Sequence, residues 1–556
     1  MKLVWLDLNS SYAHSSLALP ALHAQLPANE EINWYKISAT INENIGMVVE
    51  HIVEQQPDIL AATMWLFNHE QLIHITSRIK AILPQTCIIL GGPEFLGNNK
   101  SFLHKNPFVD AVFRGEGEEQ FAKWLSVWQN RNDWKSITGL CYLDNDDNYQ
   151  DNGLARVMNF AELKSPEESI FFNWDKPFIQ LETTRGCFNT CAFCVSGGEK
   201  PIRTLDIDTI RQRLINIQKH GIQNIRVLDR TFNYNTRRAK ELLSLFLEFP
   251  SIRFHLEIHP ALLSDELKEL LINLPKGLLH LEAGIQSLRE SVLENSKRIG
   301  KLSDALNGLR YLCSLNNMET HADLIAGLPH YKLNEIFEDI VTLAQYKAGE
   351  IQLESLKLLP GTEMRRRATE LRISYSPLPP YEVLQTNAIS NSELQIARQL
   401  SRLLDAFYNT PAWREVTRQL IIEQKEFLHQ LLNHLVEGNL IDQPMSLEKR
   451  GIVLYHFCKQ YYPSYLHAIS IAWIEAGMSL KKEPAEKVRS KHVCPPEEWE
   501  VLYGNYHEEL RLCFLPTNEK SNEGYWLDLK QKSNTSLPYS KPKVFFNNDN
   551  NHTHRQ

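Results

Sequence analysis

Short apolar runs alternate with amphipathic stretches over the first 125 residues of the chain. The stretches between the runs carry apolar residues three and four positions apart, the spacing of a helix with one buried face. Strands that alternate with helices predict right-handed crossovers and a parallel, doubly wound sheet. We therefore expect an α/β, Rossmann-like domain over residues 1–128, with strands at 3–8, 32–38, 58–66, 87–94 and 109–113.

Polar and glycine-rich turns follow the first, fourth and fifth of these strands. They are Asn9–Ser16, Gly91–Pro93 and Gly115–Gly117. Because a doubly wound sheet binds ligands in the crevice beyond the carboxyl ends of its strands, these turns are the expected binding edge. Residues 129–175 show no strong periodicity and contain the polar run DNDDNYQDN, which predicts a connector with a loop or a small hairpin.

A second alternation of strands and helices occupies residues 176–375. Helices are expected at 206–220, 236–248 and 264–273, and strands at 176–186, 224–233, 252–260, 278–287, 320–329 and 351–361. A complete eight-unit barrel takes about 250 residues. Six strand–helix units in a shorter segment therefore predict a partial TIM barrel, (β/α)6.

The pattern changes after the proline break PLPPY near residue 376. Residues 390–440 and 446–490 carry helical periodicity, so a mostly α-helical domain is expected over 376–532. The last segment, 533–556, is polar and rich in Asn, Lys and Pro, which predicts a disordered tail.

Composition limits the class of protein. The chain has 556 residues, 43% of them hydrophobic and 23% charged, which is typical of a globular protein with about three domains. Its 59 Lys and Arg against 67 Asp and Glu argue against nucleic-acid binding driven by charge, and no nucleic-acid site is evident. No apolar run is long enough for a membrane helix, and the N-terminus resembles a first strand more than a signal peptide. We expect a cytoplasmic protein without a membrane partner.

Three of the nine cysteines fall within eight residues, in Cys187-Phe-Asn-Thr-Cys191-Ala-Phe-Cys194. They follow an apolar strand, at the end where α/β active sites gather. Three thiolates so placed suit a [4Fe–4S] cluster with one iron left open, whereas a structural zinc site normally needs a fourth protein ligand. Zinc binding and coincidental packing of the cysteines stay as alternatives.

At these residues the sequence resembles the radical S-adenosylmethionine (SAM) enzymes, whose signature is C-x3-C-x-aromatic-C, with Phe193 as the aromatic residue. The resemblance implies that Cys187, Cys191 and Cys194 hold the cluster and that its open iron chelates SAM. Reductive cleavage of SAM would give a 5′-deoxyadenosyl radical that abstracts hydrogen from a substrate. The electron would come from a donor such as flavodoxin or ferredoxin.

The resemblance continues through the later strands of the barrel. VLDRTFN (227–233) is similar to the second-strand segment of the family, EAGIQS (282–287) to the fourth, and DLIAGLP (323–329) and LPGT (359–362) to the fifth and sixth. It implies cofactor contacts that include Ser287 and Arg298, with Asp229, Glu257 and Glu282 as further candidates. Each of these three carboxylates could equally cap a following helix. Gly197-Gly198-Glu199 follows the cysteine loop directly and is assigned no contact with the SAM amine; Asp229, Arg230 or backbone groups are the candidates for that role.

The N-terminal domain resembles the cobalamin-binding domain that precedes the radical domain in one branch of the superfamily. The resemblance implies that Gly91, Gly92, Gly115 and Gly117 let the backbone approach a corrin ring closely. The lower-ligand motif D-x-H-x-x-G is reduced here to Tyr12-Ala-His14-Ser-Ser-Leu17. His14 is therefore either a cobalt or cofactor contact or a loop histidine bonded to the backbone.

The whole layout is similar to a bacterial subfamily of cobalamin-type radical SAM proteins whose helical C-terminal domain has no assigned function. The first hypothesis is an enzyme that uses a [4Fe–4S] cluster, SAM and cobalamin for C-methylation, or for a radical rearrangement or cyclisation, of a small-molecule or unknown substrate. A second is the same radical chemistry without bound cobalamin. A third is a non-enzymatic iron–sulfur or corrinoid sensor or electron carrier. A methylthiotransferase fits poorly, because the N-terminal domain has no second cysteine triad and no small RNA-binding barrel is evident at the C-terminus.

Overall fold

The computed structural model describes residues 1–11, 16–27, 32–479 and 482–485, together with the backbone of four short strands at 489–490, 512–516, 524–528 and 545–547. The chain divides into two units. The first comprises Met1–Ile336 and Glu354–Leu394, and the second comprises Phe337–Leu353 and Gln395–Gln556. The cobalamin-type domain and most of the barrel expected from the sequence therefore belong to one unit.

The first unit begins with a sheet in the order β2-β1-β3-β4-β5-β6-β7. Its first five strands pair in parallel, as the alternation predicted. The five strands are β1 (Lys2–Asn9), β2 (Asn33–Thr40), β3 (Ile59–Thr63), β4 (Cys87–Gly91) and β5 (Ala111–Phe113). The helices between and after them are α1 (Ala18–Ala24), α2 (Ile45–Gln55), α3 (His69–Ile82), α4 (Lys100–Lys105) and α5 (Glu118–Val127).

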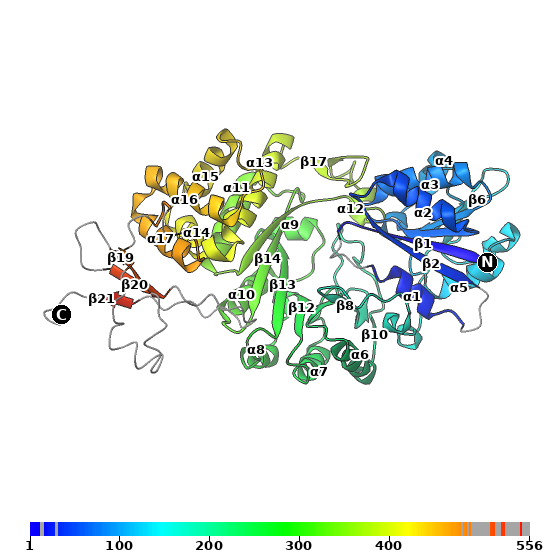
Figure 1. Ribbon diagram of the computed structural model, residues 1–556, viewed down its shortest axis with the longest axis horizontal. Coiled ribbons are helices and arrows are strands. Elements are labelled where there is room, and N and C mark those ends of the chain that lie inside the picture. The colour runs from blue at the N-terminus through cyan, green and yellow to red at the C-terminus, as the bar shows by residue number, and fades with distance from the viewer. Residues whose placement is uncertain are drawn as a thin grey trace. The chain divides into compact units, whose positions relative to one another are not determined.

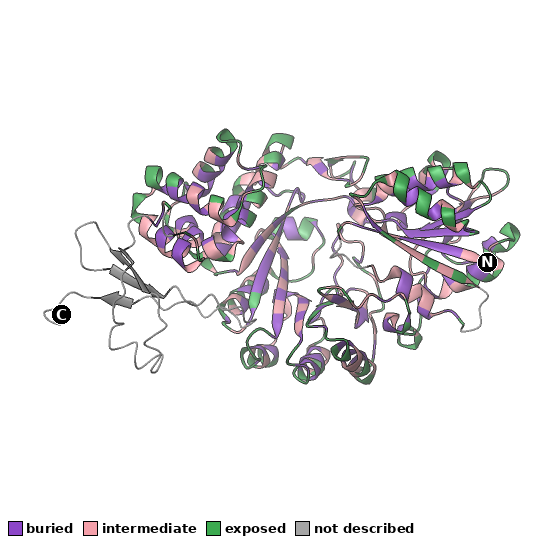
Figure 2. Ribbon diagram, in the orientation of Figure 1, coloured by how far each residue is buried: buried purple, intermediate pink, exposed green. Residues whose placement is uncertain are grey.

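Helices cover both faces of this sheet (Figure 1). Alternate residues of β1 separate the two cores, because successive side chains of a strand point to opposite faces. Val4 and Leu6 pack with α2, α3 and α4, whereas Leu3 and Trp5 pack with α1 and α5. Figure 2 shows the result, with buried strands between helices whose outer faces are exposed.

The connector expected at 129–175 contributes a hairpin to the same sheet. Strand β6 (Leu140–Leu143) pairs antiparallel with β5, and β7 (Tyr149–Asp151) pairs antiparallel with β6. The polar run that predicted a loop or a small hairpin forms the turn between them, where Asp144 accepts hydrogen bonds from the amides of Asp146 and Asn148, both at 2.9 Å.

A second parallel sheet of the first unit runs in the order β14-β13-β12-β11-β8. Its strands are β8 (Ile179–Leu181), β11 (Asn224–Val227), β12 (Arg253–Ile258), β13 (Leu279–Gln286) and β14 (Glu319–Ala326). The helices that connect them are α6 (Ile207–Lys219), α7 (Thr236–Phe246), α8 (Asp265–Ile272), α9 (Glu290–Asn295) and α10 (Leu302–Ser314). Strand β15 (Glu350–Ser355), the sixth that the sequence predicted, crosses the division between the units.

Strands β12 and β13 alternate strictly between buried and half-buried residues. Leu256 and Leu281, which are buried, belong to the face that packs under helices, while Glu257 and Glu282 belong to the other face. In a barrel of this kind the second face lines the interior. The interior of this barrel is therefore polar.

The segment Glu354–Leu394 belongs to the first unit, although the sequence placed the start of a third domain near residue 376. It contains α12 (Glu363–Arg366) and the antiparallel strands β16 (Ser374–Tyr375) and β17 (Val383–Gln385). The Tyr381 hydroxyl donates to Glu94 at 2.7 Å, which also lies 3.1 Å from Nδ1 of His69. A buried polar contact thus attaches this segment to the N-terminal domain.

The second unit is mostly helical, as expected. Its helices are the end of α11 (Leu333–Gln345), α13 (Asn391–Leu403) with a π-helical continuation to Tyr408, α14 (Pro411–Glu423), α15 (Phe427–Glu437), α16 (Leu447–Tyr461) and α17 (Leu466–Glu475). Trp413 and Trp473 lie in its core, where Gly451 leaves room for the Trp413 ring: a Cβ at that glycine would lie 2.5 Å from it.

One sheet of the second unit was not predicted from the sequence. Strands β18 (Arg489–Ser490), β19 (Leu512–Pro516), β20 (Gly524–Asp528) and β21 (Phe545–Asn547) pair antiparallel in that order. Apart from β21, the tail predicted at 533–556 lies outside the described residues. Within the part of the chain that is described, no helix is both long and apolar enough to cross a bilayer.

Candidate active site

The cysteine loop follows β8 and the two-residue strand β9 (Thr184–Arg185). Backbone hydrogen bonds fix it at both ends: Cys187 donates to Glu199 at 3.1 Å, and Gly198 donates to Asn189 at 2.7 Å. Its middle is attached to the later part of the barrel, because the amide of Ala192 donates to Ser296 at 2.9 Å. The loop is therefore held on several sides before any cofactor binds.

The three thiols are largely shielded from solvent. Cys187 and Cys191 are buried, and burial raises the pKa of Cys191 and of Cys194. By their chemistry, three thiolates suit a [4Fe–4S] cluster with one open iron, whereas a structural zinc ion normally takes a fourth protein ligand.

Arg298 lies beside the cysteine loop. Its Nη1 is 3.6 Å from the sulfur of Cys191, and its Nη2 donates to the carbonyl oxygen of Gly284 on β13. The guanidinium opposes the effect of burial on the Cys191 thiol and so favours the thiolate that binds iron. The structure thus places Arg298 beside the cysteine loop, and its contact with a cofactor stays a prediction.

Asp229 has a positioning role in the structure. It is 1% exposed, and its carboxylate accepts from the amides of Thr183 at 2.8 Å and Thr184 at 2.9 Å and from the Thr183 hydroxyl. Burial raises its pKa, and these hydrogen bonds act in the opposite direction. Asp229 thus ties the end of β11 to the chain that enters the cysteine loop, and a direct contact with SAM stays a prediction.

Arg230 and Glu257 lie near the cysteine loop and influence its charge. Burial raises the pKa of Glu257 to about 7, while Arg230 opposes the shift and Glu282 adds to it. Arg230 in turn favours the ionised form of Cys194. Glu257 thus lies near Cys194 of the cysteine loop, and its contact with a cofactor stays a prediction.

Two further predicted residues lie in the same region without a contact that defines their role. Ser287 follows β13 and is fully buried, and its hydroxyl accepts from the amide of Arg289 at 3.2 Å. Phe193 is half-buried within the cysteine loop. The contacts of Ser287 and Phe193 with a cofactor stay predictions. His14, the candidate cobalt ligand of the N-terminal domain, lies outside the described residues.

The carboxylate of Glu282 lies beside two histidine rings. Nε2 of His255 lies 2.9 Å from this carboxylate, and Nε2 of His321 lies 3.6 Å away. Burial acts to raise the pKa of Glu282, but its contacts with these two rings outweigh burial and lower it. Glu282 thus lies between histidines of the barrel interior, and its contact with a cofactor stays a prediction.

The histidines of the barrel interior were not predicted from the sequence. Three strands carry the same pattern of a histidine, an apolar residue and an acid: His255-Leu-Glu257, His280-Leu-Glu282 and His321-Ala-Asp323. Because strand side chains alternate, each pattern sends its two polar groups to one face. This repeated pattern was visible in the sequence and could have indicated a row of inward-facing histidines and acids, although it does not say which of them meet. Burial lowers the pKa of His280 to about 4, so its ring is neutral near pH 7.

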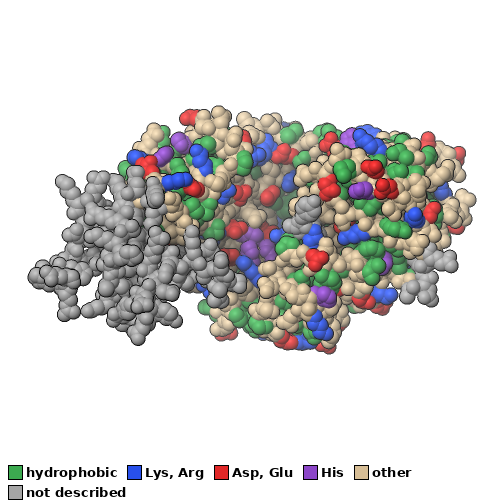
Figure 3. Space-filling model, in the orientation of Figure 1, with side chains coloured by type: hydrophobic (Ala, Val, Ile, Leu, Met, Phe, Trp, Pro, Cys, Tyr) green, Lys and Arg blue, Asp and Glu red, His purple; other side chains and the backbone are tan. Residues whose placement is uncertain are grey.

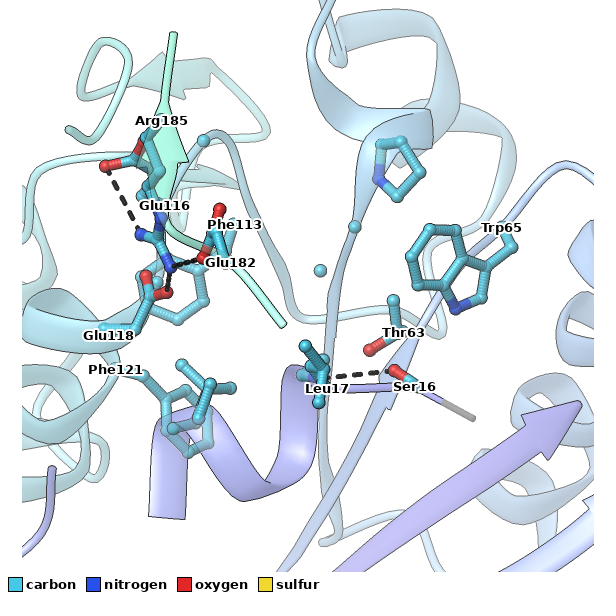
Figure 4. Close-up of a pocket in the computed structure, with 18 of the residues that line it drawn as sticks. Ser16, Leu17, Thr63, Trp65, Phe113, Glu116, Glu118, Phe121, Glu182 and Arg185 are labelled. Carbon is cyan, nitrogen blue, oxygen red and sulfur yellow. Dashed lines mark hydrogen bonds and ion pairs between the residues drawn. The ribbon is translucent and has the colours of Figure 1, made fainter. Parts of the chain in front are cut away.

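A cavity of about 520 Å³ opens between the N-terminal sheet and the mouth of the barrel (Figure 4). All four glycines that the sequence singled out line it: Gly91, Gly92, Gly115 and Gly117. On the other side, Arg185, Gly186 and Arg230 line it from the barrel. Trp65 from the end of β3 and Leu17 from the start of α1 also face it (Figure 4).

At two of these four positions the backbone conformation leaves no room for a side chain. Gly92 has φ +112°, and a Cβ there would lie 2.6 Å from the carbonyl oxygen of Met64. Gly115 has φ +101°, and a Cβ would lie 2.3 Å from the carbonyl oxygen of Ala155. Gly91 and Gly117 meet no such backbone obstacle: a Cβ would meet only side chains, Phe113 Cβ at 3.8 Å from Gly91 and Leu22 Cδ2 at 3.1 Å from Gly117.

A charged network joins the glycine turns to the cysteine loop. Arg185 pairs with Glu118 at 2.6 Å and with Glu182 at 2.9 Å (Figure 4). Arg203 pairs with Glu116 at 2.7 Å and with Glu199 at 2.8 Å. Because these ion pairs are largely buried, they fix the wall of the cavity in place. They also include Glu199, to which the sequence assigned no contact with SAM.

The family comparison agrees with this site. Residues 181–343 match the radical SAM superfamily, and residues 369–553 match a family described as a protein of unknown function (DUF4080). The chain contains a radical SAM domain, whose cofactors are a [4Fe–4S] cluster and SAM, and the three thiols with Arg298 suit that cluster.

Three proteins are similar to this chain over a longer stretch than the radical SAM domain. The cobalamin-dependent radical SAM methyltransferase TokK from Streptomyces tokunonensis is 20% identical over 333 residues, 56% of this chain and 48% of TokK. The structure of OxsB with aqua-cobalamin and SAM bound aligns with a TM-score of 0.59 at 14% identity, over 85% of this chain and 78% of OxsB. TsrM from Kitasatospora setae, with cobalamin and [4Fe–4S] cluster bound, aligns with a TM-score of 0.55 at 15% identity, over 68% of this chain and 78% of TsrM. The chain spans about half the length of the curated relatives it matches.

Proposed function

We propose that this protein is a cobalamin-dependent radical SAM enzyme that methylates a carbon atom of an organic substrate. The observation that carries the proposal is the cavity that the glycine turns of the N-terminal domain share with the mouth of the barrel. A corrin held there would lie between the domain that binds it and the radical site. The N-terminal domain, about residues 1–128, is thus the cobalamin domain of the proposal.

The wall of the cavity suits one face of a corrin. Gly91 and Gly117 present backbone without side chains, and Trp5, Leu22 and Phe121 contribute apolar surface. A flat macrocycle buries mostly apolar area, which such a wall stabilises. TokK, TsrM and OxsB, named above as cobalamin proteins, support the same ligand for this chain.

The residues of this chain position the cofactors and exclude water. When bound, the cluster and SAM supply the substrate radical, and cobalamin supplies the methyl group. Asp229 holds the entry to the cysteine loop, and Arg298 keeps Cys191 in the form that binds iron. The network around Arg185 keeps the N-terminal turns against the barrel mouth.

We also propose that the protein works in the reducing environment of the cytoplasm and receives its electron from a separate donor of the flavodoxin or ferredoxin class. All seven cysteines in the described part of the chain are free thiols. Free thiols and an oxygen-sensitive cluster suit a reducing compartment. The substrate is expected to be a small molecule.

Replacement of Gly91 with leucine should remove cobalamin and spare the iron–sulfur cluster. The new side chain enters the cavity without backbone strain, because a Cβ at Gly91 meets only the Phe113 Cβ, at 3.8 Å. We expect bound corrinoid to fall to less than about a tenth, since displacement of the ring costs more than about 1.4 kcal/mol. Iron content and formation of 5′-deoxyadenosine from SAM should persist. Absorption spectra and metal analysis after anaerobic reconstitution measure both.

The matched control is Met47→Leu, which places the same side chain at an exposed position of α2. It should retain corrinoid and cluster alike. If the unaltered chain cleaves SAM but never retains corrinoid when cobalamin is supplied, cobalamin dependence is wrong and the same chemistry without cobalamin takes its place. If reduction with SAM yields no 5′-deoxyadenosine, the enzymatic proposal itself is wrong.

A further inference from the structure

Three adjacent strands of the barrel bring three histidine rings together. His255 on β12 is in register with His280 on β13, and Glu282 on β13 is in register with His321 on β14. One ligand nitrogen from each of the three rings lies within 4.8 Å of the other two. The ring centroids are 5.0 Å apart for His255 and His280, and 4.8 Å apart for His280 and His321.

The histidines lie in the polar interior and not in the apolar packing under the helices. The side chain of His321 is 5% exposed and that of His255 is 20% exposed, so a small ion can reach the group from the barrel. Figure 3 shows histidine and acidic side chains gathered in a hollow over the strands of the barrel. A position in the apolar core would more often hold an apolar residue than a histidine.

The carboxylate of Glu282 lies where it can orient the histidine rings. It lies 2.9 Å from Nε2 of His255, which leaves Nδ1 of that ring available. Metal-binding imidazoles commonly donate their other nitrogen to a carboxylate, which fixes the tautomer and the orientation of the ring. Arg253, two residues before His255 on β12, is paired with Glu319 at 2.8 Å, so its charge is balanced.

We propose that His255, His280 and His321 bind a divalent transition-metal ion of the zinc class inside the barrel, with Glu282 as the carboxylate that orients the site. Three imidazoles with a supporting carboxylate are a ligand set that zinc prefers. Bond lengths of about 2.0–2.1 Å place the nitrogens about 3.3 Å apart, so the widest pair must close by about 1.5 Å through rotation of the rings. Three protein ligands leave a coordination position open to water or to a substrate oxygen.

This site is distinct from the cysteine loop in position and in chemistry. The acids Glu257 and Asp323 follow the histidines by two residues on their strands and so lie between the histidines and the carboxyl ends that carry the loop. Nitrogen ligands suit zinc, whereas the three thiols suit iron and sulfide. The inference stands whether or not cobalamin binds, because it uses no residue of the N-terminal domain.

Zinc binding by the full chain tests the proposal. The protein is reconstituted anaerobically with iron and sulfide, equilibrated with Zn²⁺ and dialysed, and its zinc is measured by mass spectrometry and by X-ray absorption at the zinc edge. We expect one zinc ion per chain with nitrogen and oxygen neighbours at about 2.0–2.1 Å and no sulfur at about 2.3 Å. His280→Ala should lose this zinc, and Glu282→Gln should bind it about 10–100-fold more weakly.

The control is His104→Ala, which removes an exposed histidine from α4 and should leave zinc binding unchanged. Iron content of the His280→Ala protein should also equal that of the unaltered chain, which shows that the variant is folded around its cluster. A sulfur shell around zinc, equal zinc in the His280→Ala protein, or no zinc retained by the unaltered chain would each overturn the proposal.

Discussion

Replacement of Cys191 with alanine should abolish assembly of the iron–sulfur cluster and, with it, the cleavage of SAM. The sulfur is buried, with Asn189 Oδ1 3.3 Å away and Arg298 Nη1 3.6 Å away. With two thiolates left, a cluster that needs three protein ligands is not held. We expect iron and sulfide near background after reconstitution, and 5′-deoxyadenosine at the level of a sample without protein.

The matched control is Cys313→Ala on α10. Burial raises the pKa of the Cys313 thiol to about 12, so it is an inert packing residue. That variant should assemble the cluster and cleave SAM as the unaltered chain does. If the Cys191→Ala protein turned over SAM normally, the assignment of the cysteine loop would fail.

Replacement of Asp229 with alanine should strongly destabilise the first unit. The change removes all three hydrogen bonds of the carboxylate and leaves the amides of Thr183 and Thr184 buried without their acceptor. Each buried donor left unsatisfied costs about 1–3 kcal/mol, so the two amides together predict a loss of at least about 2 kcal/mol. Asp229→Asn, which keeps one acceptor oxygen, should lose less. Chemical denaturation of the anaerobic protein measures the free energy of unfolding.

Asp206→Ala provides the comparison. Asp206 caps α6 by accepting from the amide of Thr209 at 2.8 Å, and loss of such a cap costs about 1 kcal/mol. Cluster content should also fall in the Asp229→Ala protein although all three cysteines are present, because the chain entering the loop is no longer held. Equal stability and equal iron content in the two variants would show that Asp229 does not position the loop.

The strand order and the cluster loop were predictable because they depend on local patterns. Alternation of apolar runs with helical periodicity is enough to define five parallel strands and their crossovers, and β1 to β5 lie where it placed them. The spacing of Cys187, Cys191 and Cys194 is likewise a property of one short segment. The four short strands near the C-terminus were missed, because short antiparallel strands depend on partners distant in the sequence.

The roles of single side chains depended on contacts between distant segments. The sequence by itself determined the class of chemistry, because a triad of cysteines after a buried strand carries that information in a dozen residues. Only the tertiary structure decided that Asp229 bonds to Thr183, 46 residues away, and that Glu282 meets His255 and His321. Strand register determines which polar groups face one another across a barrel. Register depends on the packing of the whole sheet, so a short stretch of sequence does not reveal it.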